Sequence, residues 1–342
     1  MNGAAHLLCR LLAMPETART LDARQWGEVM TVARAELLIG SLAFRLRGMV
    51  LPERVEAILA AAIRSAEEGR RQALWEAEMA RRALAPLGCP VALLKGTAFV
   101  AAGLDAGQGR HIGDLDILVP RASLDAAEAA LLGAGWEWVK PDPYDDAYYR
   151  RWMHELPPLI HRERDRMIDV HHTILPPTAR TTPDAAKLLA AAEPLGNGLS
   201  ILSPEDMVIH AAIHLFADGD LSGGLRNLWD IDRLVRECIA RDADYPAGLA
   251  ARAAEHQAER AVARALRAAH ALFDTPALPG KAERLFDAAA RRRLLARDGW
   301  GRGTRPATRL AFYVRSHWLR MPPAMLARHL WIKFMRDRRA GA

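Results

Sequence analysis

Residues 110–119 read Arg-His-Ile-Gly-Asp-Leu-Asp-Ile-Leu-Val, and this stretch says more about the fold than any other part of the chain. From residue 114 onward its apolar side chains alternate with Asp114 and Asp116, which is the period of a β-strand at residues 114–119. A short apolar run of strand length stands upstream at residues 91–94, and after it come Lys95-Gly96-Thr97 and a helix of small residues from Ala98 to about Gly103. Strands separated by helices indicate a sheet domain.

The pattern continues downstream of this strand. Ser123–Leu132 is expected to be a helix, since it has acidic residues in its first turns and glycines after its end. Further strands are expected at residues 136–139, 156–161 and 167–174. The sheet domain therefore covers about 90 residues, and we place it at residues 89–180.

The rest of the chain shows the three-to-four-residue spacing of amphipathic helices. Residues 21–87 have this spacing, and Ser203-Pro204-Glu205-Asp206 is typical of a helix start. Further helices are expected at residues 224–240, 247–272, 281–297, 305–318 and 323–338. The predicted fold class is α+β and mostly helical. It consists of an N-terminal helical segment at residues 1–88, the α/β core at 89–180 and a C-terminal helical domain at 181–342.

Three acidic residues are candidate metal ligands. Asp114 and Asp116 lie two residues apart on a strand, so both carboxylates project from the same face. Two adjacent carboxylates repel each other unless a cation lies between them, and Mg²⁺ prefers such oxygen ligands together with substrate phosphates. Asp169, on a second strand, adds a third carboxylate. Three acids on adjacent strands can hold two metal ions roughly 3.5–4 Å apart, so we expect two Mg²⁺ ions, with Mn²⁺ as a substitute.

Lys95-Gly96-Thr97 has the composition of a phosphate-binding turn. A glycine after a strand lets backbone N–H groups approach a phosphate, and the following helix N-terminus favours negative charge. Thr97 adds a hydroxyl group, Lys95 a positive charge, and Arg110 is expected to reach a triphosphate oxygen from its loop. Each signal alone is unspecific, because Asp-x-Asp often lies at a solvated edge and Gly-Thr is a common turn. Their order along the chain favours a nucleotide site.

Taken in order, Leu94-Lys95-Gly96-Thr97, residues 110–119 and Ile168-Asp169-Val170-His171 resemble the DNA polymerase β-like nucleotidyltransferase superfamily, and within it the uncharacterised nucleotidyltransferase family. The resemblance covers about residues 90–240, and the outer helical regions match only in general character. It implies the polymerase β-like mixed sheet, with Gly96 and Thr97 at the phosphate turn and the three acids at the metal-binding, catalytic positions. Lys95-Gly96-Thr97 departs from the commoner Gly-Gly or Gly-Ser pair, which leaves the choice of nucleotide open.

The reaction that this resemblance implies is Mg²⁺-dependent attack of a hydroxyl group on the α-phosphorus of an NTP such as ATP, with release of pyrophosphate. The third carboxylate would assist the incoming hydroxyl group. The acceptor is expected to be a small molecule or biosynthetic intermediate bound under the helical domain. The alternatives are nucleotidyl transfer to RNA or protein, and a nucleotide-binding protein without catalysis.

Four residues are candidates for the acceptor pocket: His171, His210, Arg226 and Asp230. His171 shares a strand face with Asp169, and packing is an equal alternative for it. His210 and His214 have a spacing that can bind zinc, but no third ligand is evident and a core or interface role is favoured. Arg226 and Asp230 are most simply an intrahelical ion pair. In the functional interpretation they line the acceptor pocket with His210.

Composition excludes several classes of protein. The 342 residues are 51% hydrophobic and 26% charged, so the chain can bury a core and is not disordered. No stretch approaches the roughly 18 apolar residues of a membrane span. The three cysteines are scattered, which excludes a disulfide framework. We expect a soluble cytoplasmic protein.

Positive charge is concentrated towards the C-terminus. Residues 291–342 contain 14 Arg or Lys and two Asp, a net charge of +12, whereas the whole chain carries +6. Such a region can contact nucleic acid or a membrane surface. A solvated helical surface explains it equally well.

Overall fold

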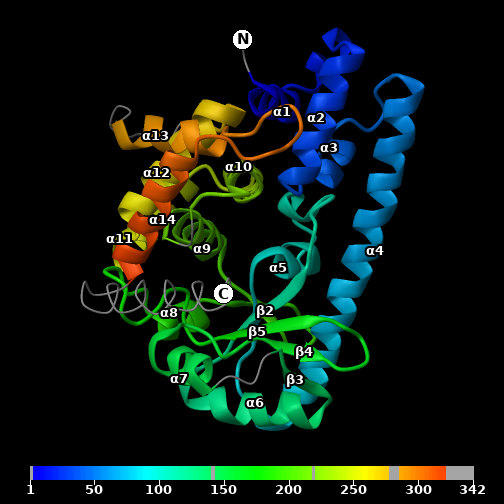
Figure 1. Cartoon of the computed structure of the whole chain (residues 1–342). Helices are drawn as coiled ribbons and strands as arrows, with labels where there is room; N and C mark the ends of the chain where they lie inside the picture. The colour runs from blue at the N-terminus through cyan, green and yellow to red at the C-terminus, as the bar shows by residue number, and fades with distance from the viewer. Residues whose placement is uncertain (1–2, 140–142, 218–219, 277–284, 321–342) are drawn as a thin grey trace, which may run out of the picture.

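The computed structural model describes residues 3–139, 143–217, 220–276 and 285–320, and a mixed seven-stranded sheet lies at its centre (Figure 1). The strands lie in the order β3-β4-β5-β2-β1-β7-β6. Their bounds are Ala92–Leu93 (β1), Asp114–Leu118 (β2), Trp136–Trp138 (β3), Leu159–His161 (β4), Met167–His171 (β5), Glu193–Pro194 (β6) and Ser200–Ile201 (β7). All five predicted strands are confirmed, each somewhat shorter than expected. The sequence did not predict β6 and β7, because two residues are too few to show a period.

The register of the sheet places the two acidic strands side by side. β2 and β5 are parallel, with Asp116 opposite Asp169 and Ile117 opposite Val170. Side chains opposite each other on neighbouring strands project to the same face of a sheet. The two aspartates therefore point the same way, while Ile117 and Val170 are buried on the other face.

Helices precede the sheet, as predicted. They are α1 (Ala4–Ala13), α2 (Ala23–Ala35), α3 (Ile39–Arg45) and the 32-residue α4 (Glu53–Leu84). Asp22 and Gln25 form a reciprocal capping box at the start of α2, which fixes where that helix begins. α4 runs along one side of the molecule and packs against β2, α5 (Lys95–Ala101) and α6 (Leu124–Gly133) (Figure 1).

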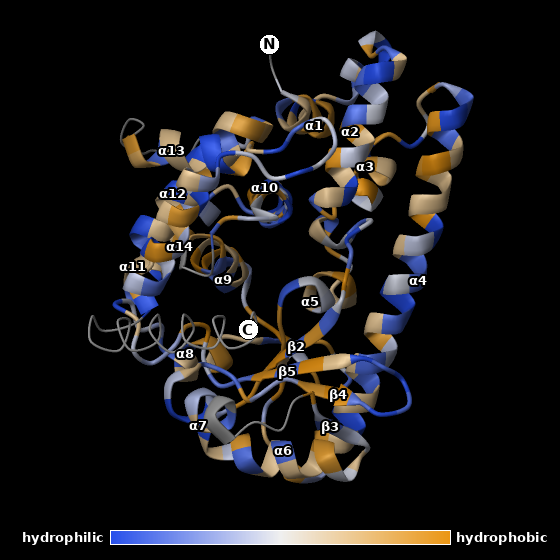
Figure 2. Cartoon of the chain, in the orientation of Figure 1, coloured by the Kyte–Doolittle hydropathy of each residue, from blue (hydrophilic) through white to orange (hydrophobic). Residues whose placement is uncertain are grey.

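The C-terminal half of the chain is mostly helical. Its elements are α9 (Pro204–Ala217), α10 (Gly224–Arg241), α11 (Tyr245–Glu255), α12 (Glu259–Phe273), α13 (Leu285–Leu294) and α14 (Pro306–Arg320), and the shorter α7 (Pro143–Trp152) and α8 (Ala185–Ala190) lie nearer the sheet. The α+β, mostly helical fold class is confirmed. In Figure 2 the strands β2 and β5 are coloured as largely apolar, whereas α4 carries polar residues along its length.

One helix was predicted wrongly. Residues 247–272 form two helices, α11 and α12, because the chain turns at Gln257, whose φ of +56° ends the first of them. The turn lets both helices pack against α9. The helix expected at 281–297 is described from Leu285, and the one expected at 323–338 lies outside the described residues.

Part of the C-terminal positive charge is used within the fold. Arg297 Nε lies 2.7 Å from Glu36 Oε1 on the N-terminal side of the molecule, and Arg293 and Arg309 both pair with Asp220. In the part of the chain that the structure describes, every helix is too short or too polar to span a membrane.

Candidate active site

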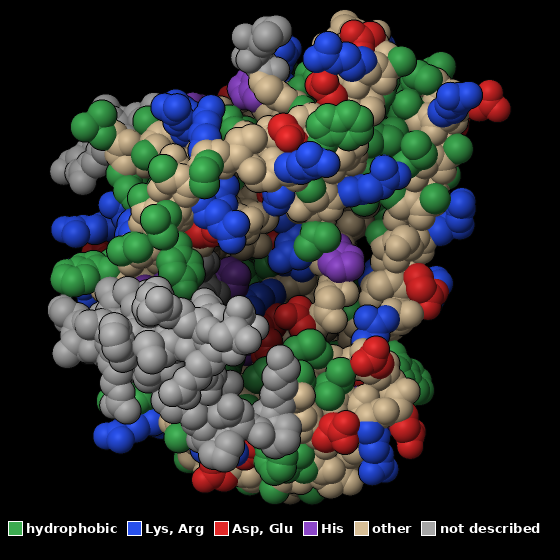
Figure 3. Space-filling model, in the orientation of Figure 1, with side chains coloured by type: hydrophobic (Ala, Val, Ile, Leu, Met, Phe, Trp, Pro, Cys, Tyr) green, Lys and Arg blue, Asp and Glu red, His purple; other side chains and the backbone are tan. Residues whose placement is uncertain are grey.

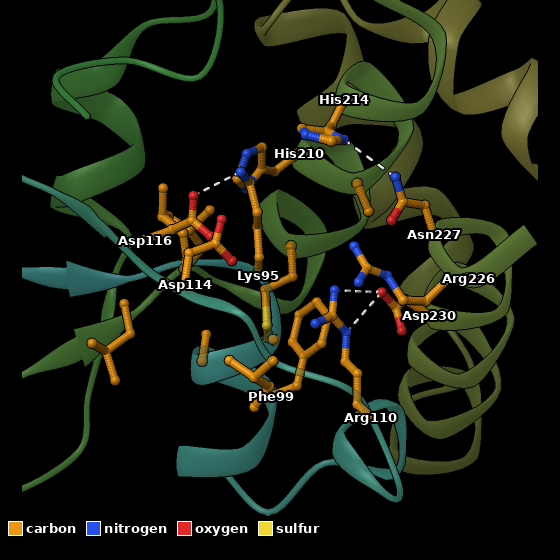
Figure 4. A pocket seen from close by; sticks show the side chains of 18 of the residues that line it. Lys95, Phe99, Arg110, Asp114, Asp116, His210, His214, Arg226, Asn227 and Asp230 are labelled. Carbon is orange, nitrogen blue, oxygen red and sulfur yellow. Dashed lines mark hydrogen bonds and ion pairs between the residues drawn. The ribbon is translucent and has the colours of Figure 1, made fainter. Parts of the chain in front are cut away.

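A cavity of about 200 Å³ lies between the sheet and the helices α9 and α10, and it gathers most of the predicted site residues. Figure 3 shows acidic, basic and histidine side chains around this hollow, and Figure 4 shows its interior. Its lining includes the predicted residues Lys95, Gly96, Arg110, Asp114, Asp116, His210, Arg226 and Asp230, together with His111, His214 and Asn227.

Asp114 and Asp116 line the sheet wall of the cavity, and Asp169 lies beside them, outside the lining. One oxygen each of Asp114, Asp116 and Asp169 lie within 4.8 Å of one another. Asp114 is exposed, Asp116 is buried and Asp169 is half-buried. Burial and the charges of Glu155 and Asp116 raise the pKa of Asp169 to about 7. A cluster of mutually repelling oxygen ligands suits a hard divalent cation, so these residues fit the predicted metal.

Asp116 is held by two donors on one of its oxygens. Lys95 Nζ donates to Asp116 Oδ1 over 2.7 Å, and His171 Nε2 lies 3.0 Å from the same oxygen. Burial opposes ionisation of Asp116, but the Lys95 charge and the His171 hydrogen bond outweigh it and hold the pKa of Asp116 well below its usual range. Lys95 was predicted to add a positive charge to the phosphate-binding turn. The structure pairs it with Asp116, 21 positions away, a contact that the sequence did not predict.

Glu155 and His154 complete the surroundings of His171, and neither was predicted. Glu155 Oε2 lies 3.3 Å from His171 Nδ1 and 3.7 Å from His154 Nε2. A backbone bridge between Glu155 and His171 brings the carboxylate there. No local pattern marks Glu155, because its position depends on pairing with β5. Glu155 contacts His171, which in turn contacts Asp116, so this series of contacts orients the Asp116 carboxylate that was predicted to bind a metal.

The first turn of α5 differs from the prediction. The helix begins at Lys95, not at Ala98, and Lys95 has a φ of +49°, which is uncommon for a residue with a Cβ atom. A Cβ atom at Gly96 would lie 2.0 Å from Arg110 Nη1, so the guanidinium group of Arg110 packs directly on this glycine. Thr97 is 1% exposed, lies outside the cavity lining, and its hydroxyl group has no hydrogen-bond partner among the described residues.

A buried ion pair joins the loop before β2 to α10. Arg110 Nε and Nη2 both lie 3.0 Å from Asp230 Oδ2, and the two side chains are 7% and 4% exposed. Arg110 Nη1 also donates to the backbone oxygen of His111 over 3.2 Å. Arg110 was predicted to reach a triphosphate oxygen, and its contact with Asp230, 120 positions away, was not predicted.

The expected ion pair between Arg226 and Asp230 is wrong. Their side chains lie on one helix four residues apart, yet Arg226 Nε and Asp230 Oδ1 are both buried without a hydrogen-bond partner among the described residues. The carboxylate of Asp230 is oriented towards Arg110 instead (Figure 4).

His210 and His214 form part of the helical wall. Their rings pack edge to face with centroids 6.4 Å apart, and Asn227 Nδ2 lies 3.2 Å from His214 Nδ1. Burial and the nearby charge of Lys95 lower the pKa of His210 well below its usual value, so its ring is neutral. Neither histidine belongs to a group of three ligand-type side chains in the described ranges, which favours packing over zinc.

A family model described as an uncharacterised nucleotidyltransferase matches residues 22–274, which is 253 of the 342 residues. The matched range contains all of the cavity-lining residues. No curated protein matches the chain.

Proposed function

The chain belongs to the uncharacterised nucleotidyltransferase family, and we propose that its cavity transfers the nucleoside monophosphate of an NTP, such as ATP, to a hydroxyl group of a small molecule. Membership of the family, which the sequence motifs predicted, indicates nucleotidyl transfer in general, with an NTP and a divalent metal ion. The assignment of individual residues to these ligands is our proposal.

The convergence of three carboxylates, two of which line the cavity, carries this proposal. They come from two parallel strands whose register sets Asp116 opposite Asp169. Asp114 and Asp116 share the cavity with Arg226 of α10 and with the ion pair between Arg110, in the loop before β2, and Asp230 of α10. A triphosphate with a divalent cation fits between an acidic and a basic wall. Neither wall alone would favour such a ligand.

Asp114, Asp116 and Asp169 would hold one or two Mg²⁺ ions, with Mn²⁺ as a substitute. Bound divalent ions polarise the α-phosphate and stabilise the leaving pyrophosphate. Lys95 and His171 both use Asp116 Oδ1, so they fix the carboxylate and leave Oδ2 for a ligand. These two side chains are positioning residues in our proposal.

In the proposed reaction the acceptor oxygen attacks the α-phosphorus, and the bond from that phosphorus to the bridging oxygen breaks, so pyrophosphate leaves. The proton of the acceptor hydroxyl group passes to Asp169. Burial and the charges of Glu155 and Asp116 raise the pKa of Asp169 to about 7 in the metal-free site. Bound cations would lower that pKa and keep the carboxylate ionised, as an acceptor of the proton must be. Catalysis then depends on positioning and charge neutralisation.

The remaining predicted residues divide between the two substrates. The triphosphate would lie over Gly96, close to Lys95 and Arg110, while Thr97 would support α5 from within. The acceptor would contact the wall formed by His210 and Asp230, with His171 behind the carboxylates. Because the cavity has a volume of only about 200 Å³ and lies between the sheet and two helices, a small acceptor fits better than the end of an RNA or a protein segment.

Calorimetry tests the proposal with a non-hydrolysable analogue of each NTP, with and without Mg²⁺. We expect metal-dependent binding by the wild type and its loss in Asp114→Asn/Asp116→Asn. Asp125→Asn, at an exposed position in α6, is the matched control and should bind as the wild type does. Asp169→Asn should still bind the analogue but release no pyrophosphate from the NTP when hydroxyl-bearing acceptors are supplied.

Two results would contradict the proposal. One is folded wild-type protein that binds no NTP analogue in the presence of Mg²⁺. The other is equal binding by the wild type and the double variant. Binding without release of pyrophosphate from the NTP, whichever acceptor is supplied, would favour a nucleotide-binding protein without catalysis.

A further inference from the structure

Arg226 on α10 is a half-buried cation, and its side chain makes no hydrogen bond to Asp230, the acid closest to it in sequence. Its Nε atom has no hydrogen-bond partner among the described residues, and neither has Oδ1 of Asp230 on the next turn of the helix. Asp230 uses its other oxygen for Arg110. Arg226 lines the cavity, and Figure 4 shows its guanidinium group directed into it.

The groups around Arg226 leave its charge poorly compensated. Burial and the neighbouring charge of Arg110 lower the pKa of Arg226, and the attraction of Asp230 is shared with Arg110. His210 on the facing helix α9 is neutral and brings no negative charge. The other acids that act on Arg226 are Asp114 and Asp116, which our proposed function assigns to metal ions. With metal bound, Arg226 would therefore need another anion, since a buried unpaired charge is costly.

We propose that Arg226 anchors an anion subsite on the helical wall of the cavity and that this subsite binds a phosphate group. The forked N–H donors of a guanidinium group match two oxygens of a phosphate. Arg226 faces the same cavity as the acidic cluster but from a different element, so a bound phosphate would link α10 to the sheet. This inference rests on the proposed function, which brings a triphosphate into the cavity.

The phosphate has two sources with different consequences. If it belongs to the NTP, Arg226 helps to hold the donor substrate. If it belongs to the acceptor, the enzyme acts on a phosphorylated small molecule. Both sources require the same guanidinium group, and they differ in which probe loses affinity when that group is removed.

Calorimetry with Arg226→Met and Arg226→Lys separates the two sources. The first probe is a non-hydrolysable ATP analogue with Mg²⁺, and the second is inorganic phosphate added to protein saturated with that analogue. Arg226→Met should weaken one of the two by roughly tenfold to a hundredfold, the usual range for a lost charge-assisted hydrogen bond. Loss of analogue affinity identifies the triphosphate. Loss of phosphate binding alone identifies the acceptor. Arg226→Lys should be intermediate.

Two controls keep the result interpretable. Arg241→Met, at the exposed end of the same helix, should bind both probes as the wild type does. Thermal unfolding of ligand-free Arg226→Met should show little loss of stability, because Arg226 Nε has no hydrogen-bond partner among the described residues to lose. A merely structural role for Arg226 would instead lower the unfolding temperature and leave the affinities unchanged.

The inference would be overturned if Arg226→Met bound both probes as tightly as the wild type does. It would also be overturned if the wild type bound neither probe. The Asp114→Asn/Asp116→Asn variant separates this failure from that of the proposed function. If it binds the analogue normally while Arg226→Met does not, the anion subsite stands and the metal-dependent function fails. The opposite pattern keeps the function and removes the subsite.

Discussion

Replacing Asp230 by alanine should destabilise the protein far more than replacing Arg110, with which it forms an ion pair, by methionine. The side chain of Asp230 is 4% exposed, and its Oδ2 atom lies 3.0 Å from both Nε and Nη2 of Arg110. Without it, the guanidinium groups of Arg110 and Arg226 would share a buried region with no carboxylate from α10. Their mutual repulsion is already one of the causes that lower the pKa of Arg226.

The magnitude follows from the burial of the pair. Removing one partner of a buried ion pair costs about 3–5 kcal/mol, most of it from the charge left behind. In Arg110→Met the carboxylate left behind still has Arg226 one helical turn away, so the loss should be nearer to about 1–3 kcal/mol. The ion pair Arg24–Glu28, 2.9 Å long and with Arg24 exposed, offers a contrast, since Arg24→Ala should cost less than about 1 kcal/mol.

Urea unfolding followed by circular dichroism measures these differences. The expected order of stability is wild type and Arg24→Ala, then Arg110→Met, then Asp230→Ala. The double variant Arg110→Met/Asp230→Leu should be more stable than Asp230→Ala, because it removes the stranded charge. Equal losses for Asp230→Ala and Arg24→Ala, or a double variant with the summed loss, would refute the reasoning.

Three further predictions concern the sheet wall. The pKa of Asp169 is raised from 3.8 to about 7 on folding, so protonation of this carboxyl group stabilises the folded state. This contribution is fully present below pH 3.8 and is lost as the pH rises to about 7. Urea unfolding in EDTA across this range should show that loss in the wild type and not in Asp169→Asn. Glu155→Gln removes a charge that raises this pKa, so the same stability loss should occur at lower pH, and an unshifted curve would contradict the assignment. Gly96→Ala should displace Arg110 and destabilise the protein by about 1–3 kcal/mol. Gly69→Ala in α4 is the control: a Cβ atom there would have no atom within 4 Å, so it should stabilise the protein by up to about 1 kcal/mol. Equal effects of the two substitutions in thermal unfolding would exclude the steric explanation.

Much of the fold could be predicted because its signals are local. The alternation around Asp114 and Asp116 marked β2 correctly, and the helix start at Pro204 was correct. The errors have local causes too. Residues 247–272 have a continuous helical spacing, and nothing in that spacing shows that Gln257 takes a left-handed conformation. β6 and β7 were missed because two residues carry no period.

The site was predicted less completely than the fold. The three acids could be found because their spacing on strands sets the face from which they project. Glu155 could not, because only the backbone pairing with His171 brings it near them. The contact between Lys95 and Asp116 could not be predicted for a similar reason, since only the fold brings these residues, 21 positions apart, together.

The sequence by itself determined which residues form strands and helices, which acids share a face, and which family the chain belongs to. The tertiary structure alone decided the partners of the charges. Spacing on α10 offered Asp230 to Arg226, but the loop before β2 brings Arg110 to that carboxylate from 120 positions away. Periodicity is a property of neighbouring residues, whereas an ion pair depends on which surfaces pack together. Packing at this cavity leaves Arg226 turned towards the space where we place a phosphate.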